Sequence, residues 1–277
     1  MTIAVGIVFH RSPVCPWVRS EPGLDVLVRA NAADGNRPTP WLGFGANHNL
    51  LIREASDADW YVALNPDVRA AGNDIKRLVA AADAADIDVA APLLEAPWGV
   101  EGARAALPGS ALWLRETIVG ARGAAAGRGR VRPSAWVGGA CMALRLDRLE
   151  ARFDEDYFMY FEDVALCNRV AASGGRIGVC TDVVLSHHSG WSDADPLRWR
   201  RGVQYARSAV RFADEVGESP RAMRAAGLLR FGSRQLAPRR SGSERVAACV
   251  ITRGFVSPWR SPGLSELADD FNAAHRR

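Results

Sequence analysis

The stretch GFGANHNLLIREASDADWYVALNPDV, residues 43–68, decides the fold class. It is helix-like over 46–55 and then forms an apolar strand over 60–64, which Asn65-Pro66 ends. The same alternation extends outward, with strand-like runs at 2–9, 25–28 and 87–91 and a helix that Asn73 caps and that runs to about Ala85. Alternating strands and helices predict an α/β fold, a parallel sheet with helices on both faces.

Ligands of such sheets bind at the carboxyl ends of the strands. This rule directs attention to three places: Phe9-His10 after the first strand, residues 29–35 after the second, and Asn65-Pro66-Asp67 after the third. From 93 to 132 the pattern gives way to Pro, Gly, Ala and Arg, which predicts a long irregular excursion with a mobile tip. Short strands are expected at 176–180 and 183–186.

Three acidic or imidazole groups stand at element ends. Asp67 follows a strand, Glu162 and Asp163 open a helix closed by Gly174, and His187 ends a strand. A carboxylate with an imidazole suits Mg²⁺ or Mn²⁺, and a further carboxylate suits a general base. Simpler explanations stay open: a turn at 65–67, a helix-dipole contact at 162–163, and a hydrogen-bonded structural histidine.

Composition excludes several classes. The chain has 277 residues, of which 48% are hydrophobic and 24% charged, unlike a disordered, collagenous or coiled-coil protein. Its net charge of +4 does not indicate a nucleic-acid binder. Five scattered cysteines without a CxxC pair argue for a reducing compartment and against a zinc ribbon. The beginning TIAVGIVF lacks a signal peptide and no apolar run is long enough to span a bilayer, so we expect a cytoplasmic protein.

Two segments resemble a known family. Residues 43–68 are similar to the donor-binding stretch of family 2 glycosyltransferases with a GT-A fold, bacterial rhamnosyltransferases being the nearest match. WVGGACMALRLDRLEARFDEDYFMYFEDVALCNRVAASGGRIGVCTDVVLSHHSG, residues 136–190, resembles the catalytic half of the same family. The resemblance spans roughly 24–215 and implies a GT-A-like, Rossmann-like domain over 1–216, followed by a helical C-terminal extension over 217–277.

The resemblance also implies roles for single residues. Asp163 would be the general base, while Asp67 and His187 would hold a divalent cation, Mg²⁺ or Mn²⁺. The donor-binding residues would be Phe9, His10, Asn49, Asn65 and Asp67. The acceptor-binding residues would be Trp136, Gly139 and Glu162.

The implied reaction is an inverting sugar transfer from a dTDP- or UDP-sugar, with L-rhamnose from dTDP-L-rhamnose as the best match. The implied acceptor is a cell-surface glycan or its lipid carrier. The alternatives are a galactofuranosyl or other hexosyl transferase, or a degenerate sugar-nucleotide-binding module without catalysis. The family's Glu-Asp-x-Asp becomes Glu162-Asp163-Val164-Ala165 here and loses its last acid.

A basic helix is expected from 196 to 216. Between 198 and 211, arginines stand beside Leu197, Trp199 and Tyr205. Such a helix can lie at the inner face of the cytoplasmic membrane as a peripheral contact. The alternative is that its apolar face packs on the folded protein and its arginines are solvated.

Overall fold

The computed structural model describes residues 1–9, 18–31, 40–96, 99–119, 130–149, 152–188, 195, 197–236, 242–257 and 262–274. The chain forms two compact units, and each is described by itself. The first unit comprises 1–107, 124–156 and 162–189, and the second comprises 108–123, 157–161 and 190–277. The second unit includes the helix that precedes the boundary predicted at 216/217, and that boundary stays a prediction.

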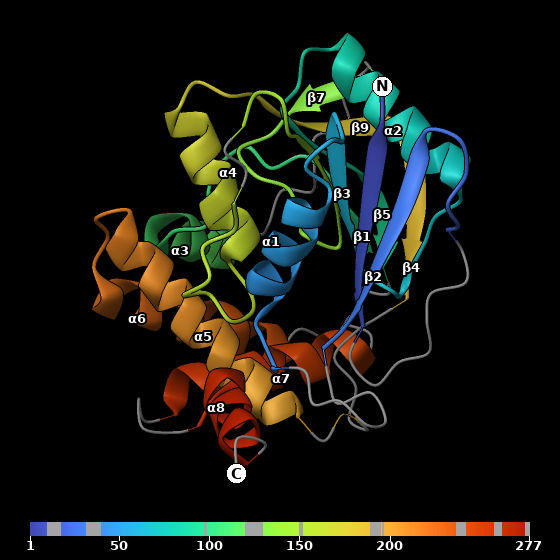
Figure 1. The fold of residues 1–277 in the computed structure, drawn as a ribbon. Helices are drawn as coiled ribbons and strands as arrows, with labels where there is room; N and C mark the ends of the chain where they lie inside the picture. The colour runs from blue at the N-terminus through green and yellow to red at the C-terminus, as the bar shows by residue number, and fades with distance from the viewer. Residues whose placement is uncertain are drawn as a thin grey trace. The chain divides into compact units, whose positions relative to one another are not determined.

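A nine-stranded sheet forms the centre of the first unit (Figure 1). Seven strands follow one another in the order β2-β1-β3-β8-β5-β9-β4, while β6 pairs with β5 and β7 with β9. Their bounds are β1 Ile3–Phe9, β2 Leu24–Ala30, β3 Trp60–Leu64, β4 Val68–Arg69, β5 Val89–Ala96, β6 Gly99–Glu101, β7 Val131–Pro133, β8 Cys141–Arg145 and β9 Ile177–His187.

The sheet is mixed, so the prediction of a parallel sheet is only partly right. β1 runs parallel to β2 and β3, and β5 runs parallel to β9, as the strand–helix alternation predicts. β8, however, runs antiparallel to both of its neighbours, β3 and β5. β8 follows the long segment after β5 rather than a crossover helix, so nothing in its local sequence fixes its direction.

Helices cover both faces of this sheet, as predicted. α2 (Gly72–Ala84) packs Ile75, Leu78, Val79 and Ala82 against one face, an i, i+3, i+4, i+7 stripe. α1 (Phe44–Glu54) and α4 (Glu162–Ala172) cover the other face with Leu51, Ile52, Leu166 and Val170 (Figure 1). Two buried apolar clusters result, one on each face.

Local details differ from the sequence predictions in three places. α2 begins at Gly72 rather than after Asn73, because Asp74 Oδ2 accepts a hydrogen bond from the Ala71 amide at 3.0 Å and supplies the cap. The region 93–132 is not wholly irregular, since it contains β6, α3 (Ser110–Val119) and β7. The two short strands predicted at 176–186 form the single strand β9.

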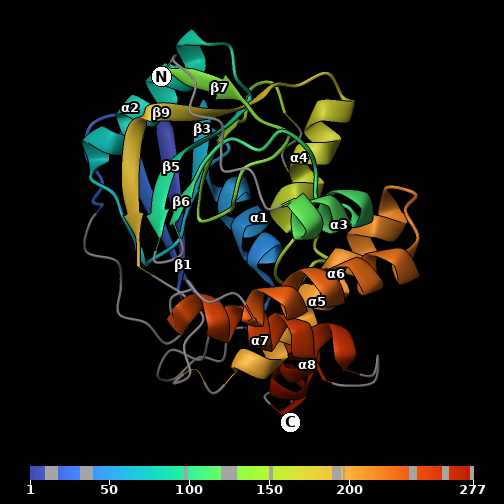
Figure 2. The ribbon, with the colours of Figure 1, turned by 180° about the vertical axis from the view of Figure 1, so that it is seen from behind.

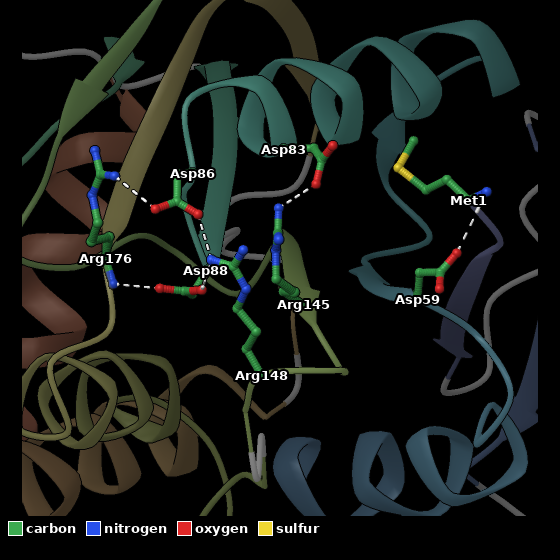
Figure 3. A network of polar contacts seen from close by, with 8 residues as sticks. All are labelled: Met1, Asp59, Asp83, Asp86, Asp88, Arg145, Arg148 and Arg176. Carbon is green, nitrogen blue, oxygen red and sulfur yellow. Dashed lines mark hydrogen bonds and ion pairs between the residues drawn. The ribbon is translucent and has the colours of Figure 1, made fainter.

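An ionic network lies at the amino-terminal edge of β5 and β9 (Figure 3). Arg148 and Arg176 both contact Asp86, and the Arg176 amide donates to Asp88 Oδ2 at 2.8 Å. Arg145, which is buried, pairs with Asp83 at the end of α2 and lies over the Trp60 ring, 4.9 Å from its centroid. This edge is opposite the carboxyl ends where ligands are expected, so the network serves stability.

The second unit is helical, with α5 (Arg198–Glu215), α6 (Pro220–Gln235), α7 (Gly242–Val256), α8 (Leu264–Ala274) and α3 (Figure 2). α5 and α7 approach closely at glycines, because a Cβ on Gly254 would lie 2.0 Å from the Gly202 carbonyl oxygen. Aromatic side chains fill the interior around Trp113: Phe161, Tyr205, Phe212, Phe231 and Phe255. Among the helices that the structure describes, none combines the length and the apolar composition needed to cross a membrane.

The face of α5 that was considered for the membrane is turned inward. Val203, Val210 and Phe212 are buried, and α5 packs against α6, α7 and α8. Several of its arginines have partners within the unit: Arg201 pairs with Asp195 at 3.1 Å, Arg207 with Glu266, and Arg211 lies over Tyr157. The alternative interpretation, packing on the folded protein, is therefore confirmed for its apolar face.

Candidate active site

Asp67 and His187 lie side by side at the carboxyl edge of the sheet. After β3 the chain turns, with the Val68 amide donating to the Asn65 carbonyl oxygen at 3.1 Å, and β4 then pairs antiparallel with the end of β9. This register sets Val68 opposite His187, and the His188 amide donates to the Asp67 carbonyl oxygen at 3.0 Å. As a result, His187 Nε2 is 3.5 Å from Asp67 Oδ1.

The two side chains differ in exposure and influence each other's charge. The His187 side chain is 9% exposed, whereas the Asp67 carboxylate is 32% exposed and open to a ligand. Burial lowers the pKa of His187, but the hydrogen bond and charge of Asp67, with the charge of Glu101, outweigh it and raise this pKa. The imidazole is thus held in a negative environment that favours a cation.

The Asp67–His187 pair fits part of a divalent cation site. A carboxylate oxygen and an imidazole nitrogen are ligands that Mn²⁺ accepts, and they converge here from two paired strands. Within the described ranges, no group of three His, Cys, Asp or Glu side chains is arranged to hold a metal. A cation held by this pair would take its remaining ligands from elsewhere, and phosphate oxygens are suitable ligands.

Asp163 lies at the first turn of α4, a short distance from the Gly-Gly segment that precedes β8. Its Oδ2 accepts a hydrogen bond from the Gly139 amide at 2.9 Å, and its Oδ1 accepts one from the Val164 amide at 2.8 Å. Burial raises the pKa of Asp163, these amides lower it, and the charge of Glu101 raises it; the net shift is upward. A positioned carboxylate with a raised pKa suits a general base.

Glu162 is the more deeply buried member of this acidic pair. It is 5% exposed, and burial together with the charge of Asp163 raises its pKa well above the ordinary range. The two residues before it, Tyr160 and Phe161, have φ angles of 69° and 67°. Residues other than glycine rarely adopt this left-handed backbone conformation, and backbone strain of this kind is concentrated at functional sites.

Of the predicted acceptor residues, Gly139 contacts Asp163 directly, and Trp136 lies three positions before Gly139 in the chain. Gly139 donates to Asp163, and a Cβ built on it would lie 3.3 Å from the Phe44 ring and 3.6 Å from the Asp163 Cβ. A larger residue would therefore press on the Phe44 ring, while its contact with Asp163 would be an ordinary one. Trp136 is half-buried and lines a cleft with Glu101 and Arg104.

The predicted donor residues have different surroundings. Phe9 ends β1, where its carbonyl oxygen accepts from the Asn31 amide at 2.8 Å, and Asn65 lies in the turn before Asp67. Asn49 is 2% exposed and ties α1 to the segment before α4: its amide donates to the Phe153 carbonyl oxygen and its oxygen accepts from the Phe153 amide. His10 lies outside the described residues. Donor binding by these four residues stays a prediction.

Glu101 is a residue of this site that the sequence did not single out. It ends β6, which pairs with β5 so that Glu101 stands opposite Leu94, and its charge acts on both Asp163 and His187. The available signal was the sequence Pro97-Trp98-Gly99, which is typical of a turn and predicts a returning strand.

His48 and Tyr61 form a buried polar pair beneath α1. His48 Nδ1 is 2.7 Å from the Tyr61 hydroxyl, and burial lowers the pKa of His48 to about 3. The pair stays neutral and packs among Phe44 and Phe153, so we assign it to the core rather than to the site.

A curated protein from two strains of Mycobacterium tuberculosis is similar to this chain. This N-acetylglucosaminyl-diphospho-decaprenol L-rhamnosyltransferase is 29% identical over 234 residues, which are 65% of this chain and 76% of the relative. No protein-family model matches the chain.

Solved structures that resemble this chain include the following three. The mannosyltransferase PcManGT from Pyrobaculum calidifontis, in complex with GDP-Man and Mn²⁺, has a TM-score of 0.48 at 14% identity and covers 99% of this chain and 85% of its own. GalNAc-T7 with UDP, GalNAc and Mn²⁺ has a TM-score of 0.49 at 15% identity and covers 98% and 57%. S. aureus TarS has a TM-score of 0.49 at 11% identity and covers 86% and 44%.

The comparisons and the structure confirm three predictions made from the sequence. The resemblance to glycosyltransferases of the rhamnosyltransferase kind is borne out by the curated relative. The fold class is α/β, with a central sheet flanked by helices. The enzyme class, glycosyltransferase, is confirmed with them.

Proposed function

We propose that this glycosyltransferase is inverting and metal-dependent, and that it transfers L-rhamnose from dTDP-L-rhamnose to a lipid-linked or cell-surface glycan acceptor. The observation that carries the proposal is Asp163: a carboxylate fixed by two backbone amides, with a raised pKa, on a different element from the Asp67–His187 pair. This separation suits an inverting transfer, in which base and leaving group lie on opposite sides of the sugar.

Each residue has a defined task in this mechanism. Asp163 accepts the proton of the acceptor hydroxyl as its oxygen attacks the anomeric carbon, and the bond from that carbon to the diphosphate breaks. Asp67 and His187 would hold the divalent cation, which would supply Lewis-acid stabilisation of the leaving diphosphate. Gly139 keeps the carboxylate of Asp163 oriented through its amide.

The proposed donor and acceptor rest on the curated relative, whose name specifies L-rhamnose and an N-acetylglucosaminyl-diphospho lipid. The test is incubation of the purified chain with dTDP-L-rhamnose, UDP-galactofuranose and other nucleotide sugars, each with and without Mn²⁺, and with a short-chain N-acetylglucosaminyl diphosphoryl lipid. Transfer of rhamnose supports the proposal. Transfer of another sugar instead identifies a different hexosyltransferase, and donor binding without any transfer identifies a non-catalytic module.

We propose that the enzyme works in the cytoplasm and meets its acceptor at the inner membrane surface. Since α5 is packed inside the second unit, the contact falls to outward apolar side chains on α3 and α6, namely Ile118, Val119 and Leu229. Co-sedimentation with anionic vesicles at low salt tests this. Ile118→Glu with Leu229→Glu should abolish binding, while Val28→Glu, at an exposed apolar site on β2 in the first unit, should not. Absence of wild-type binding would contradict the contact.

A further inference from the structure

A cleft lies beside the acid pair, within the first unit. The space that it encloses, together with the part open to solvent, is about 410 Å³. Charged and aromatic side chains line it together with a glycine and apolar residues. They are Glu101, Arg104 and Trp136, with Gly138, Pro92 and Val179. The mechanism above uses none of these residues, and Trp136 alone among them has a role predicted from the sequence, in acceptor binding.

Glu101 lies where it reaches both halves of the site. A Cβ on Gly138 would be 3.8 Å from Glu101 Oε2, which places the carboxylate against the segment leading to Gly139. The charge of Glu101 also acts on Asp163 and on His187. Glu101 is half-buried and lines the cleft, so its carboxylate is placed to contact a ligand bound there.

Arg104 and Trp136 form a second feature of the cleft. The Arg104 guanidinium lies over the Trp136 ring, 5.5 Å from its centroid. The backbone of Arg104 is fixed by its amide, which donates to Ser134 Oγ at 2.8 Å, and by its carbonyl oxygen, which accepts from the Ala135 amide at 2.7 Å. The Arg104 side chain is exposed, and in the described part of the chain it makes no ion pair with a carboxylate.

We propose that this cleft binds the acceptor of the proposed transfer, a pyranose carried on a diphosphate. The carboxylate of Glu101 accepts hydrogen bonds from the sugar hydroxyls, and the indole of Trp136 packs against the ring. The guanidinium of Arg104, whose planar donors match phosphate oxygens, contacts the diphosphate. The proposal rests on the proposed function, because it takes the transferase reaction as given.

The test compares two variants, each of which removes one charge, with two acceptors. Glu101→Gln and Arg104→Gln are assayed with a short-chain N-acetylglucosaminyl diphosphoryl lipid and with an alkyl N-acetylglucosaminide that lacks phosphate. Glu101→Gln should raise the acceptor KM about tenfold or more with both acceptors, because a charged hydrogen-bond partner is lost. Arg104→Gln should raise it only with the diphosphate acceptor. The donor KM should stay constant.

Matched controls on the same unit and on an exposed helix are available. Glu95→Gln changes an exposed acid on β5 that pairs with Val100 on β6. Arg115→Gln changes an exposed arginine on α3. Both should keep wild-type kinetics. An unchanged acceptor KM in Glu101→Gln overturns the proposal, and so does a rise confined to the donor KM, which would make this a donor-sugar site.

Failure of the cleft and failure of the proposed function give different results. If the wild type transfers no sugar, the proposed function fails, and calorimetric titration with the same diphosphoryl lipid still tests the cleft. Binding that Glu101→Gln and Arg104→Gln each weaken about tenfold, with unchanged melting temperatures, supports the site. Binding that neither variant changes, or no wild-type binding at millimolar ligand, overturns it.

Discussion

Replacing Asp163 by asparagine separates the chemistry of the base from the architecture that holds it. The aspartate accepts hydrogen bonds from two backbone amides, Gly139 at 2.9 Å on Oδ2 and Val164 at 2.8 Å on Oδ1. An asparagine has the same shape but one oxygen and one NH₂ group, so it can accept only one of these bonds well. It also cannot take up the acceptor proton at neutral pH.

The expected effects on folding and on catalysis differ in size. Losing one hydrogen bond to a charged acceptor costs about 1.5–3 kcal/mol of unfolding free energy. Removing a carboxylate whose pKa burial raises offsets part of that cost. Loss of base catalysis should lower kcat about 10²–10⁴-fold, which corresponds to about 2.7–5.5 kcal/mol in the barrier.

The assay measures initial rates of sugar transfer at saturating donor, with donor affinity and melting temperature measured in parallel. Asp163→Asn should lower kcat by at least about 10²-fold while donor affinity and folding are retained. Glu162→Gln serves as the comparison, because it alters the neighbouring acid without removing the proposed base. Near-wild-type turnover of Asp163→Asn would refute the assignment and leave another group as the base.

Three further predictions follow from the same site. Burial and the charge of Glu101 raise the pKa of Asp163, which has Glu162 beside it. As the pH is lowered, kcat/KM should therefore begin to fall at a higher pH than it would with an ordinary aspartate as the base. Glu101→Gln should move this fall to lower pH. EDTA should weaken the binding of a nucleoside diphosphate tenfold or more in calorimetry, and Asp67→Ala should reproduce that loss without EDTA; equal affinities would return Asp67 to a turn residue. Glu162→Gln should raise the free energy of unfolding at neutral pH. In the wild type, folded Glu162 holds a proton that the unfolded chain releases, so the stability of the wild type falls as the pH rises above the pKa of the unfolded side chain. Urea unfolding at pH 5 and pH 8 should therefore show the variant to be more stable than the wild type only at pH 8.

Much of the first unit follows from local sequence. The strand at Trp60–Leu64 and the helix at Glu162–Ala172 are fixed by apolar patterning and by the breakers that follow them, so their ends could be predicted closely. Since β3 and β9 end at the same edge, Asp67 and His187 could be expected near each other, and the structure places them 3.5 Å apart. Their roles as cation ligands stay a prediction.

The rest depends on pairings between distant segments, which no local pattern encodes. The direction of β8 is set by its two neighbours, and Glu101 reaches the site only because β6 folds back along β5. The basic α5 helix shows the same limit. Its amphipathic pattern predicts an apolar face but does not say whether protein or lipid covers it, and here α6 and α7 do.

The acidic pair at the start of α4 explains why Asp163 rather than Glu162 should be the base. Two adjacent carboxyl groups in a poorly solvated place cannot both ionise easily, and their surroundings push their pKa values apart. Asp163 accepts bonds from the Gly139 and Val164 amides, which favour its charged form, whereas Glu162 is more deeply buried and its pKa is raised well above the ordinary range. These surroundings favour the charge on Asp163 and the proton on Glu162. A neutral Glu162 is still able to donate a hydrogen bond to an oxygen of the acceptor substrate. Glu162→Gln would keep this donor, and Glu162→Ala would lose it.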